Sequence, residues 1–97
     1  MFDLVYNGAI LGKSIVIPTS NSESRTIQVV HNQGASAAGK LVSIETSAPT
    51  YIDTLSGNLD ANGQFQFVLG PSFGTRGNLN LVVKVSNAHK SLDVVFA

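Results

Sequence analysis

The residues that could carry catalysis are spread thinly along this sequence. Glycoside hydrolysis requires two carboxylates that face each other across a cleft. Hydrolysis by an activated serine requires that serine on a strained turn beside an oxyanion hole. The carboxylates are dispersed, at Asp3, Glu23, Glu45, Asp53, Asp60 and Asp93, and we interpret the many serines as polar surface. We therefore predict that the chain is not an enzyme and holds no cofactor.

A phosphate-binding loop is suggested by Gly12-Lys13-Ser14. That motif needs a glycine five residues before Gly12, where this sequence has Asn7. It also needs a helix after the lysine, whereas an apolar, strand-like segment follows here. We interpret Gly12-Lys13-Ser14 as a turn that enters a strand.

Two sets of residues could hold a metal ion. His31 and His89 lie far apart in sequence, and neither has a second ligand at the spacing of a zinc site. Calcium prefers the hard oxygen ligands that cluster at Asp53, Asn58, Asp60 and Asn62. Only two of those four are charged, and a turn at 60–63 accounts for Asp60 and Asn62. We predict no metal site and keep calcium at these four residues as the alternative.

The glycine-rich segment 70–78 is the best candidate for contact with a partner. It offers an aromatic side chain and an arginine, the residue types that dominate protein interfaces, and its candidate contacts are Phe73, Thr75, Arg76 and Asn78. The alternative is a connecting loop whose Phe73 folds back on the core. A second possible surface is a small aromatic platform of Tyr6, Tyr51 and Phe73 for a carbohydrate, although the chain has no tryptophan.

Charge and hydropathy exclude several classes of partner. Six basic and six acidic residues cancel, and the lysines and arginines are scattered, which argues against nucleic acid. No apolar stretch approaches the length of a membrane-spanning helix, so no membrane insertion is expected. Cysteine is absent, so no disulfide contributes. A neutral surface with only 12% charged residues favours self-association.

The elements that must position these residues are short β-strands. Apolar and polar residues alternate with period two, and turn signals separate the runs. The predicted strands are Ser14–Ile17, 25–30, 40–46, 51–55, 64–69, 78–86 and 91–96, with Phe2–Tyr6 as either an edge strand or part of a linker over 1–13. As an edge, Phe2–Tyr6 has only Asp3 to discourage pairing with a second chain.

This pattern predicts an all-β protein, a single antiparallel immunoglobulin-like β-sandwich of about seven to eight strands over residues 1–97. Phe65, Phe67, Leu79, Leu81 and Val83 should be buried in its core. Asn62-Gly63 should form a hairpin tip between two strands, since Asn-Gly accepts positive φ. A short turn is expected at 87–90.

The second half resembles the bacterial immunoglobulin-like domains of invasin and intimin-type surface proteins. The likeness rests on the small-residue loop 32–39 before the strand 40–44, on the turn 57–65, and on the final strand 92–96. It covers roughly residues 25–96, and its motifs are structural.

The resemblance implies a spacer or adhesion module at the bacterial cell surface, contacting a protein or a glycan. Two alternatives are a structural or decoration domain of a phage or virus particle, and a carbohydrate-binding accessory domain.

Overall fold

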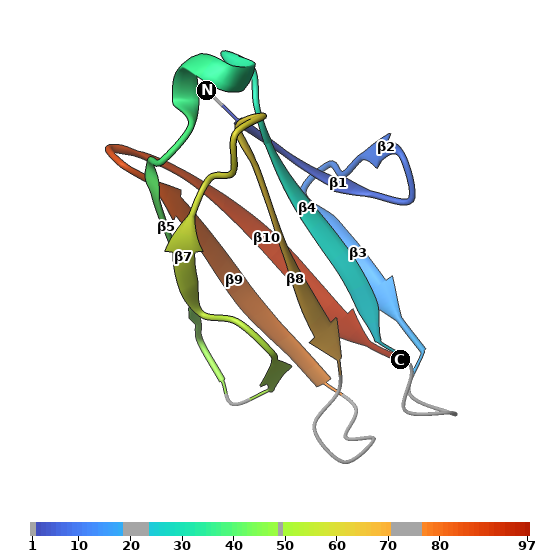
Figure 1. The fold of residues 1–97 in the computed structure, drawn as a ribbon. Coiled ribbons are helices and arrows are strands. Elements are labelled where there is room, and N and C mark those ends of the chain that lie inside the picture. Colours follow the sequence, from blue (N-terminus) through green and yellow to red (C-terminus); the bar gives the residue numbers. More distant parts are fainter. Residues whose placement is uncertain (1, 19–23, 49, 71–76) are drawn as a thin grey trace.

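The computed structural model describes residues 2–18, 24–48, 50–70 and 77–97. They form two five-stranded sheets that pack face to face in a sandwich measuring 40 × 23 × 20 Å (Figure 1). The all-β sandwich predicted from the period-two alternation is confirmed. Within the described residues, no helix is both long enough and apolar enough to span a membrane.

Sheet A has the strand order β2-β1-β4-β8-β6, and sheet B has the order β3-β10-β9-β5-β7. The strands of sheet A are β1 (Phe2–Tyr6), β2 (Ala9–Ile10), β4 (Arg25–His31), β6 (Tyr51–Ile52) and β8 (Gln64–Gly70). The strands of sheet B are β3 (Ser14–Ile17), β5 (Leu41–Thr46), β7 (Ser56–Asn58), β9 (Gly77–Val85) and β10 (Ala88–Phe96). A 3₁₀-helix, η1 (Gly34–Ala37), connects β4 to β5.

The core lies between the two sheets and is built from alternate residues of the long strands. Four of the five predicted core residues are buried, namely Phe67, Leu79, Leu81 and Val83. The prediction for Phe65 is wrong, because this side chain is only half-buried. It packs over Gly57 of β7, where an added Cβ would lie 2.5 Å from Cε1 of Phe65. A glycine at 57 therefore makes room for the ring at the rim of the core.

β1 is an inner strand of sheet A. Phe2 and Leu4 are 2% and 1% exposed, and β4 pairs with β1 along its length. The chain then turns at Asn7 and Gly8, whose φ values are +52° and +80°, and folds back as β2. Because this Asn-Gly turn brings β2 outside β1, Phe2–Tyr6 is neither a linker nor the outermost strand.

β3 carries the chain from sheet A to sheet B. The Leu11 N–H donates to the Leu4 carbonyl at 2.8 Å, and the Lys13 carbonyl then accepts from the Asp93 N–H at 2.8 Å. Gly12-Lys13-Ser14 thus lies where the chain passes from sheet A to sheet B and enters β3, in agreement with the predicted turn into a strand. β3 runs parallel to β10 over four residues, whereas the other pairs are antiparallel. It covers only the C-terminal half of β10.

The hairpin predicted at 60–63 is wrong. The strands on either side, β7 and β8, belong to different sheets, so this turn crosses from sheet B to sheet A. Gly63 has φ of +75°, and an added Cβ there would collide with the carbonyl oxygen of Gly34. The strand predicted at 51–55 is shorter than expected, since β6 in sheet A ends at Ile52 and the next strand, β7 in sheet B, begins only at Ser56.

The turn predicted at 87–90 is also misplaced. β9 and β10 are joined at Ser86 and Asn87, and β10 begins at Ala88. Ser86 takes φ of +53°, which completes the reversal in two residues. β10 is therefore longer than predicted, and His89 and Lys90 belong to it.

Candidate functional site

The predicted contact segment 70–78 falls largely outside the described residues. Phe73, Thr75 and Arg76 are in the part that the structure does not describe. Asn78 is described, and it is an exposed residue near the start of β9.

The same segment contains a feature that the interpretation of the serines as polar surface overlooks. Residues 70–74 match the pattern Gly-x-Ser-x-Gly, with Ser72 at its centre. In hydrolases this pattern joins a strand to a helix. Here Gly70 ends β8 and Gly77 begins β9, so the segment joins two strands. That context differs from a nucleophile elbow, although Ser72 itself lies outside the described residues.

Asn78 lines an open polar hollow on the outer face of sheet B. The hollow has a volume of about 520 Å³, and its polar side chains are Ser14, Ser47, Asn78, Asn80 and Asp93. Asp93 is in register with Ser14 on one side and with Asn80 on the other. The Asn80 side-chain amide donates to Oδ1 of Asp93 at 3.1 Å. The outer face of sheet B thus presents an ordered row of hydroxyl, carboxylate and amide groups.

The four calcium candidates each have a different structural setting. Asp60 uses Oδ1 to accept the N–H groups of Asn62 and Gln64, both at 2.9 Å. Asp53 accepts the Val68 N–H at 2.7 Å, and the Asn58 amide donates to the Gly39 carbonyl at 3.0 Å. These contacts hold turns and strand ends in place, and among the described residues no three acidic, histidine or cysteine side chains gather into a metal site.

The two histidines lie on different sheets. His31 ends β4 and is 8% exposed, and its Nδ1 accepts the Gln33 N–H at 3.1 Å. Burial lowers the pKa of His31, and the positive charges of the N-terminus and of Lys40 lower it further. His89 is exposed on β10. Since the His31 nitrogen is used by the backbone and His89 faces water, the two side chains do not form a pair.

The tyrosines of the predicted aromatic platform lie far apart on sheet A. Tyr6 lies on β1 and Tyr51 on β6, and two strands, β4 and β8, separate them. Three strand spacings amount to about 14 Å, too far for one flat surface. Phe73 lies outside the described residues.

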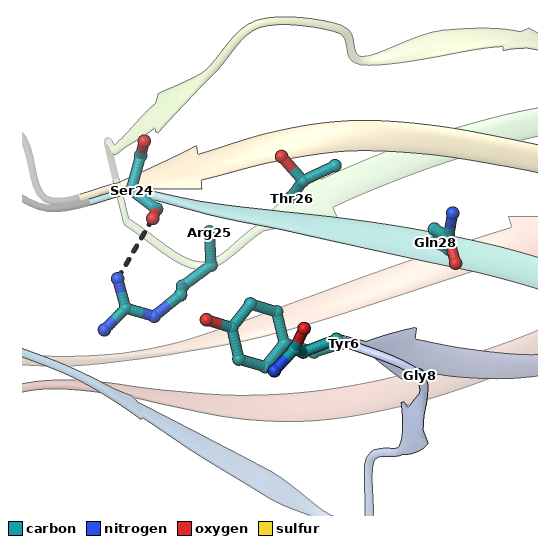
Figure 2. Close-up of a pocket in the computed structure, with 7 residues that line it drawn as sticks. Tyr6, Gly8, Ser24, Arg25, Thr26 and Gln28 are labelled. Carbon is teal, nitrogen blue, oxygen red and sulfur yellow. Dashed lines mark hydrogen bonds between the residues drawn. The ribbon is translucent and has the colours of Figure 1, made fainter.

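A second open hollow lies beside Tyr6, at the start of β4. Its volume is about 460 Å³, and we call it the Arg25 hollow; its lining is Tyr6, Asn7, Gly8, Ser24, Arg25, Thr26 and Gln28. Figure 2 shows the Arg25 side chain extending alongside the Tyr6 ring, and the guanidinium carbon lies 5.8 Å from the ring centre. Arg25 Nη1 donates to the Ser24 carbonyl at 3.0 Å. The stacking and the hydrogen bond orient the guanidinium group.

The Arg25 hollow exists because β1 ends before β4 does. The last pair between the two strands is Val5 with Gln28, so residues 25–27 of β4 continue without β1 beside them. The Leu4 carbonyl accepts the Leu11 N–H, so the backbone groups of Leu4 point away from β4. Successive residues of a strand point their backbone groups to opposite sides, so those of Val5 point toward its partner Gln28, and those of Gln28 point back toward Val5. Thr26, two residues along, therefore points its own N–H and carbonyl into the hollow.

Sequence reasoning did not find the Arg25 hollow. The sequence pattern places Tyr6 and Arg25 in two separate predicted strands and gives no sign that they meet. The available signal was Asn7-Gly8, which predicts a tight two-residue turn and therefore the early end of β1. The nearness of Arg25 to Tyr6 had no local signal, because 18 residues separate them.

The sequence matches no protein-family model and no curated protein. Solved structures do share the fold. A C-terminal 282-residue fragment of intimin, in complex with the intimin-binding domain of the translocated intimin receptor, is similar with a TM-score of 0.64 and 16% identity over 84% of this chain. The D00–D0 domain of intimin is similar with a TM-score of 0.65 and 18% identity over 98% of this chain.

A nematode protein has a similar fold as well. SSP-19 of Caenorhabditis elegans, an MSP-domain-like protein, gives a TM-score of 0.67 and 15% identity, with 87% of this chain and 94% of SSP-19 covered. This chain spans 29% and 46% of the two intimin chains. The resemblance to intimin-type immunoglobulin-like domains is thus confirmed for the fold, and identities this low show the fold alone.

Proposed function

We propose that this chain is a non-enzymatic spacer and adhesion module of a bacterial surface protein. The observation that carries the proposal is the placement of the chain ends. The start of β1 and the end of β10 lie toward opposite ends of the sandwich, and the long strands run between those ends (Figure 1). A sandwich of this shape can be joined end to end with other modules and transmit a pull along its length.

The strands that carry the two ends suit such a load. A pull on Phe2 and Ala97 directs force along β1 and β10, while their hydrogen bonds run across the strands. The bonds of β1 to β4, and of β10 to β3 and β9, are then loaded together instead of one after another. The similarity to intimin, which has been solved bound to a protein receptor, supports an adhesive setting.

The candidate catalytic side chains are dispersed over the molecule, and this supports a role without catalysis. The described carboxylates are engaged in structural contacts. Asp53 and Asp60 accept backbone N–H groups, and Asp93 accepts the Asn80 side-chain amide. Surface ion pairs join Lys84 to Glu45 at 3.3 Å and Lys90 to Asp3 at 3.4 Å. Segment 70–78 connects two strands, β8 and β9, whereas the serine of a hydrolase elbow lies between a strand and a helix.

Single-molecule force spectroscopy tests the load-bearing role. We expect a discrete unfolding event whose force drops in Ile15→Pro, because the odd residues of β3 point their N–H groups at β10. Val16→Pro is the matched control, since its N–H points to solvent, and Ile15→Ala controls for the lost side chain. The proposal fails if the domain yields gradually at low force, or if Ile15→Pro and Val16→Pro behave alike. Antibody labelling of intact cells that express the native gene tests the surface location.

A further inference from the structure

The polar hollow on the outer face of sheet B, which we call the Asp93 hollow, holds its chemical groups in a fixed arrangement. Asp93 lies between Ser14 of β3 and Asn80 of β9 in one cross-strand row, and the chain on both sides of each residue is described. The Asp93 N–H donates to the Lys13 carbonyl at 2.8 Å, and the Asn80 N–H donates to Oγ of Ser47 at 2.8 Å. Because the backbone is bonded on both sides of the row, the three side chains project from rigid strands.

This row of side chains retains hydrogen-bonding capacity toward a ligand. The Asn80 amide donates one N–H to Oδ1 of Asp93 at 3.1 Å. A carboxylate has about four acceptor sites, and an amide has a second N–H and a carbonyl oxygen. The row therefore presents a charged acceptor in Asp93, a donor and an acceptor in Asn80, and a hydroxyl in Ser14 that can play either part.

A mixture of donors and acceptors favours hydroxyl groups over a cation. A lysine or arginine side chain has donors only, so it would satisfy Asp93 while its charge faced the amide N–H of Asn80. Two neighbouring hydroxyls of a sugar ring can donate to Asp93 and accept from Asn80 at the same time. Val95 and Leu79 add apolar atoms to the lining, against which the C–H groups of a ring can pack. The volume of about 520 Å³ lies in the range of small-ligand sites.

We propose that the Asp93 hollow binds a neutral hexose residue of a surface glycan, with two adjacent sugar hydroxyls on the Asp93 carboxylate and the Asn80 amide. This inference rests on the proposed adhesive function and names the class of its partner. Ser14 contacts a further hydroxyl, and Val95 contacts the C–H groups of the ring.

Titration of the ¹⁵N-labelled chain with methyl mannoside and methyl galactoside tests the proposal by NMR. The two hexosides differ in which neighbouring hydroxyls lie on the same side of the ring. We expect at least one of them to shift the side-chain amide signals of Asn80 and the backbone signals of Ser14 and Asp93 in a saturable manner. The signals of Gln28 and Gln66, on the outer face of sheet A, should not move. Cyclohexanol, with a single hydroxyl, should bind at least about tenfold more weakly, since it cannot contact both side chains.

Variants locate the site. Asp93→Asn keeps an acceptor oxygen beside Asn80 but removes the charge, so hexoside binding should weaken at least about tenfold. Glu45→Gln is the matched control, because it removes an equal charge from an exposed position of β5 outside the hollow, and it should leave binding unchanged. The dispersion of the spectrum reports folding in each variant. The comparison of the hexosides with cyclohexanol on the unaltered chain does not depend on any variant.

Three results would overturn the proposal: no saturable shift with either hexoside, unchanged binding in a folded Asp93→Asn variant, or binding of N-acetylarginine amide at the same signals as tight as that of the hexosides. The last result would assign the hollow to a basic peptide. None of these outcomes alters the unfolding force, so failure of the glycan site and failure of the spacer role are distinguishable.

Discussion

Nζ of Lys90 lies 3.4 Å from Oδ1 of Asp3, and this contact joins the last strand of sheet B to the first strand of sheet A. It lies where β10 has no outer neighbour among the described residues, because β3 pairs only with the part of β10 that begins at Asp93. A lysine on an uncovered edge discourages pairing with another strand. The N-terminal half of β10 is therefore one edge at risk of self-association, whereas the predicted edge Phe2–Tyr6 has β2 beside it.

Replacing Lys90 should permit self-association. Lys90→Thr keeps a strand-compatible residue but removes the charge, so we expect the molecular mass from light scattering to rise with concentration. Lys84→Thr alters a lysine on β9, which has a strand on each side. Its molecular mass should match that of the unaltered chain at every concentration. Equal masses for the two variants at every concentration would contradict the guarding role of Lys90.

The two core phenylalanines should differ in their contribution to stability. Phe67 is fully buried, so Phe67→Ala should cost about 3–5 kcal/mol in the free energy of unfolding. Phe65→Ala should cost about 1–2 kcal/mol, because part of its ring already contacts water. Urea denaturation measures both. A larger loss for Phe65→Ala would mean that the ring over Gly57 is more central to the core than its exposure indicates.

Stability should fall on mild acidification because of His31. Its pKa in the folded state is lowered by burial, below the unfolded value of 6.5. The contribution of the neutral imidazole is therefore fully present above about pH 6.5 and is lost as the pH falls through the lower folded pKa. His31→Gln should flatten this dependence in urea titrations between pH 7 and pH 5, and His89→Gln should not. A flattening by His89→Gln alone would contradict the assignment.

Asp60 should stabilise the crossing turn without calcium. Its carboxylate accepts two backbone N–H groups, so Asp60→Ala should cost about 1 kcal/mol. Asp60→Asn keeps an acceptor oxygen and should cost less. We expect the same melting temperatures in EDTA and in millimolar calcium. A calcium-dependent rise in the unaltered chain that Asp60→Ala removes would instead support the calcium alternative.

Gly63 should be the less replaceable of two glycines that share the same backbone conformation. Gly39 and Gly63 have φ of +83° and +75°, but only Gly63 has backbone atoms of Gly34 where a Cβ would lie. Gly39→Ala should therefore cost about 1–2 kcal/mol for the left-handed conformation alone. Gly63→Ala should cost clearly more, because one of the two backbone segments must move. Equal losses in urea denaturation would show that the segments separate easily.

The sequence by itself determined the strands and the faces they bury. In β9, Leu79, Leu81 and Val83 stand at every second position and predict the buried face, and the same holds for Leu92 and Val94 of β10. This inference succeeds because successive side chains of a strand point to opposite faces, whichever strand lies beside it. Burial of one face is thus encoded locally.

The tertiary structure alone decided which strands are neighbours and where each one stops. Asn62-Gly63 predicts a turn but not that β7 and β8 enter different sheets, and nothing near Phe65 in sequence indicates that its ring lies over Gly57. The Arg25 hollow depends on β1 ending early beside β4, which brings Tyr6 to a residue 19 positions away. Partner choice is a competition among strands with similar alternation, and contacts distant in sequence settle it. The strands that could form the site were therefore visible in the sequence, whereas the site itself was not.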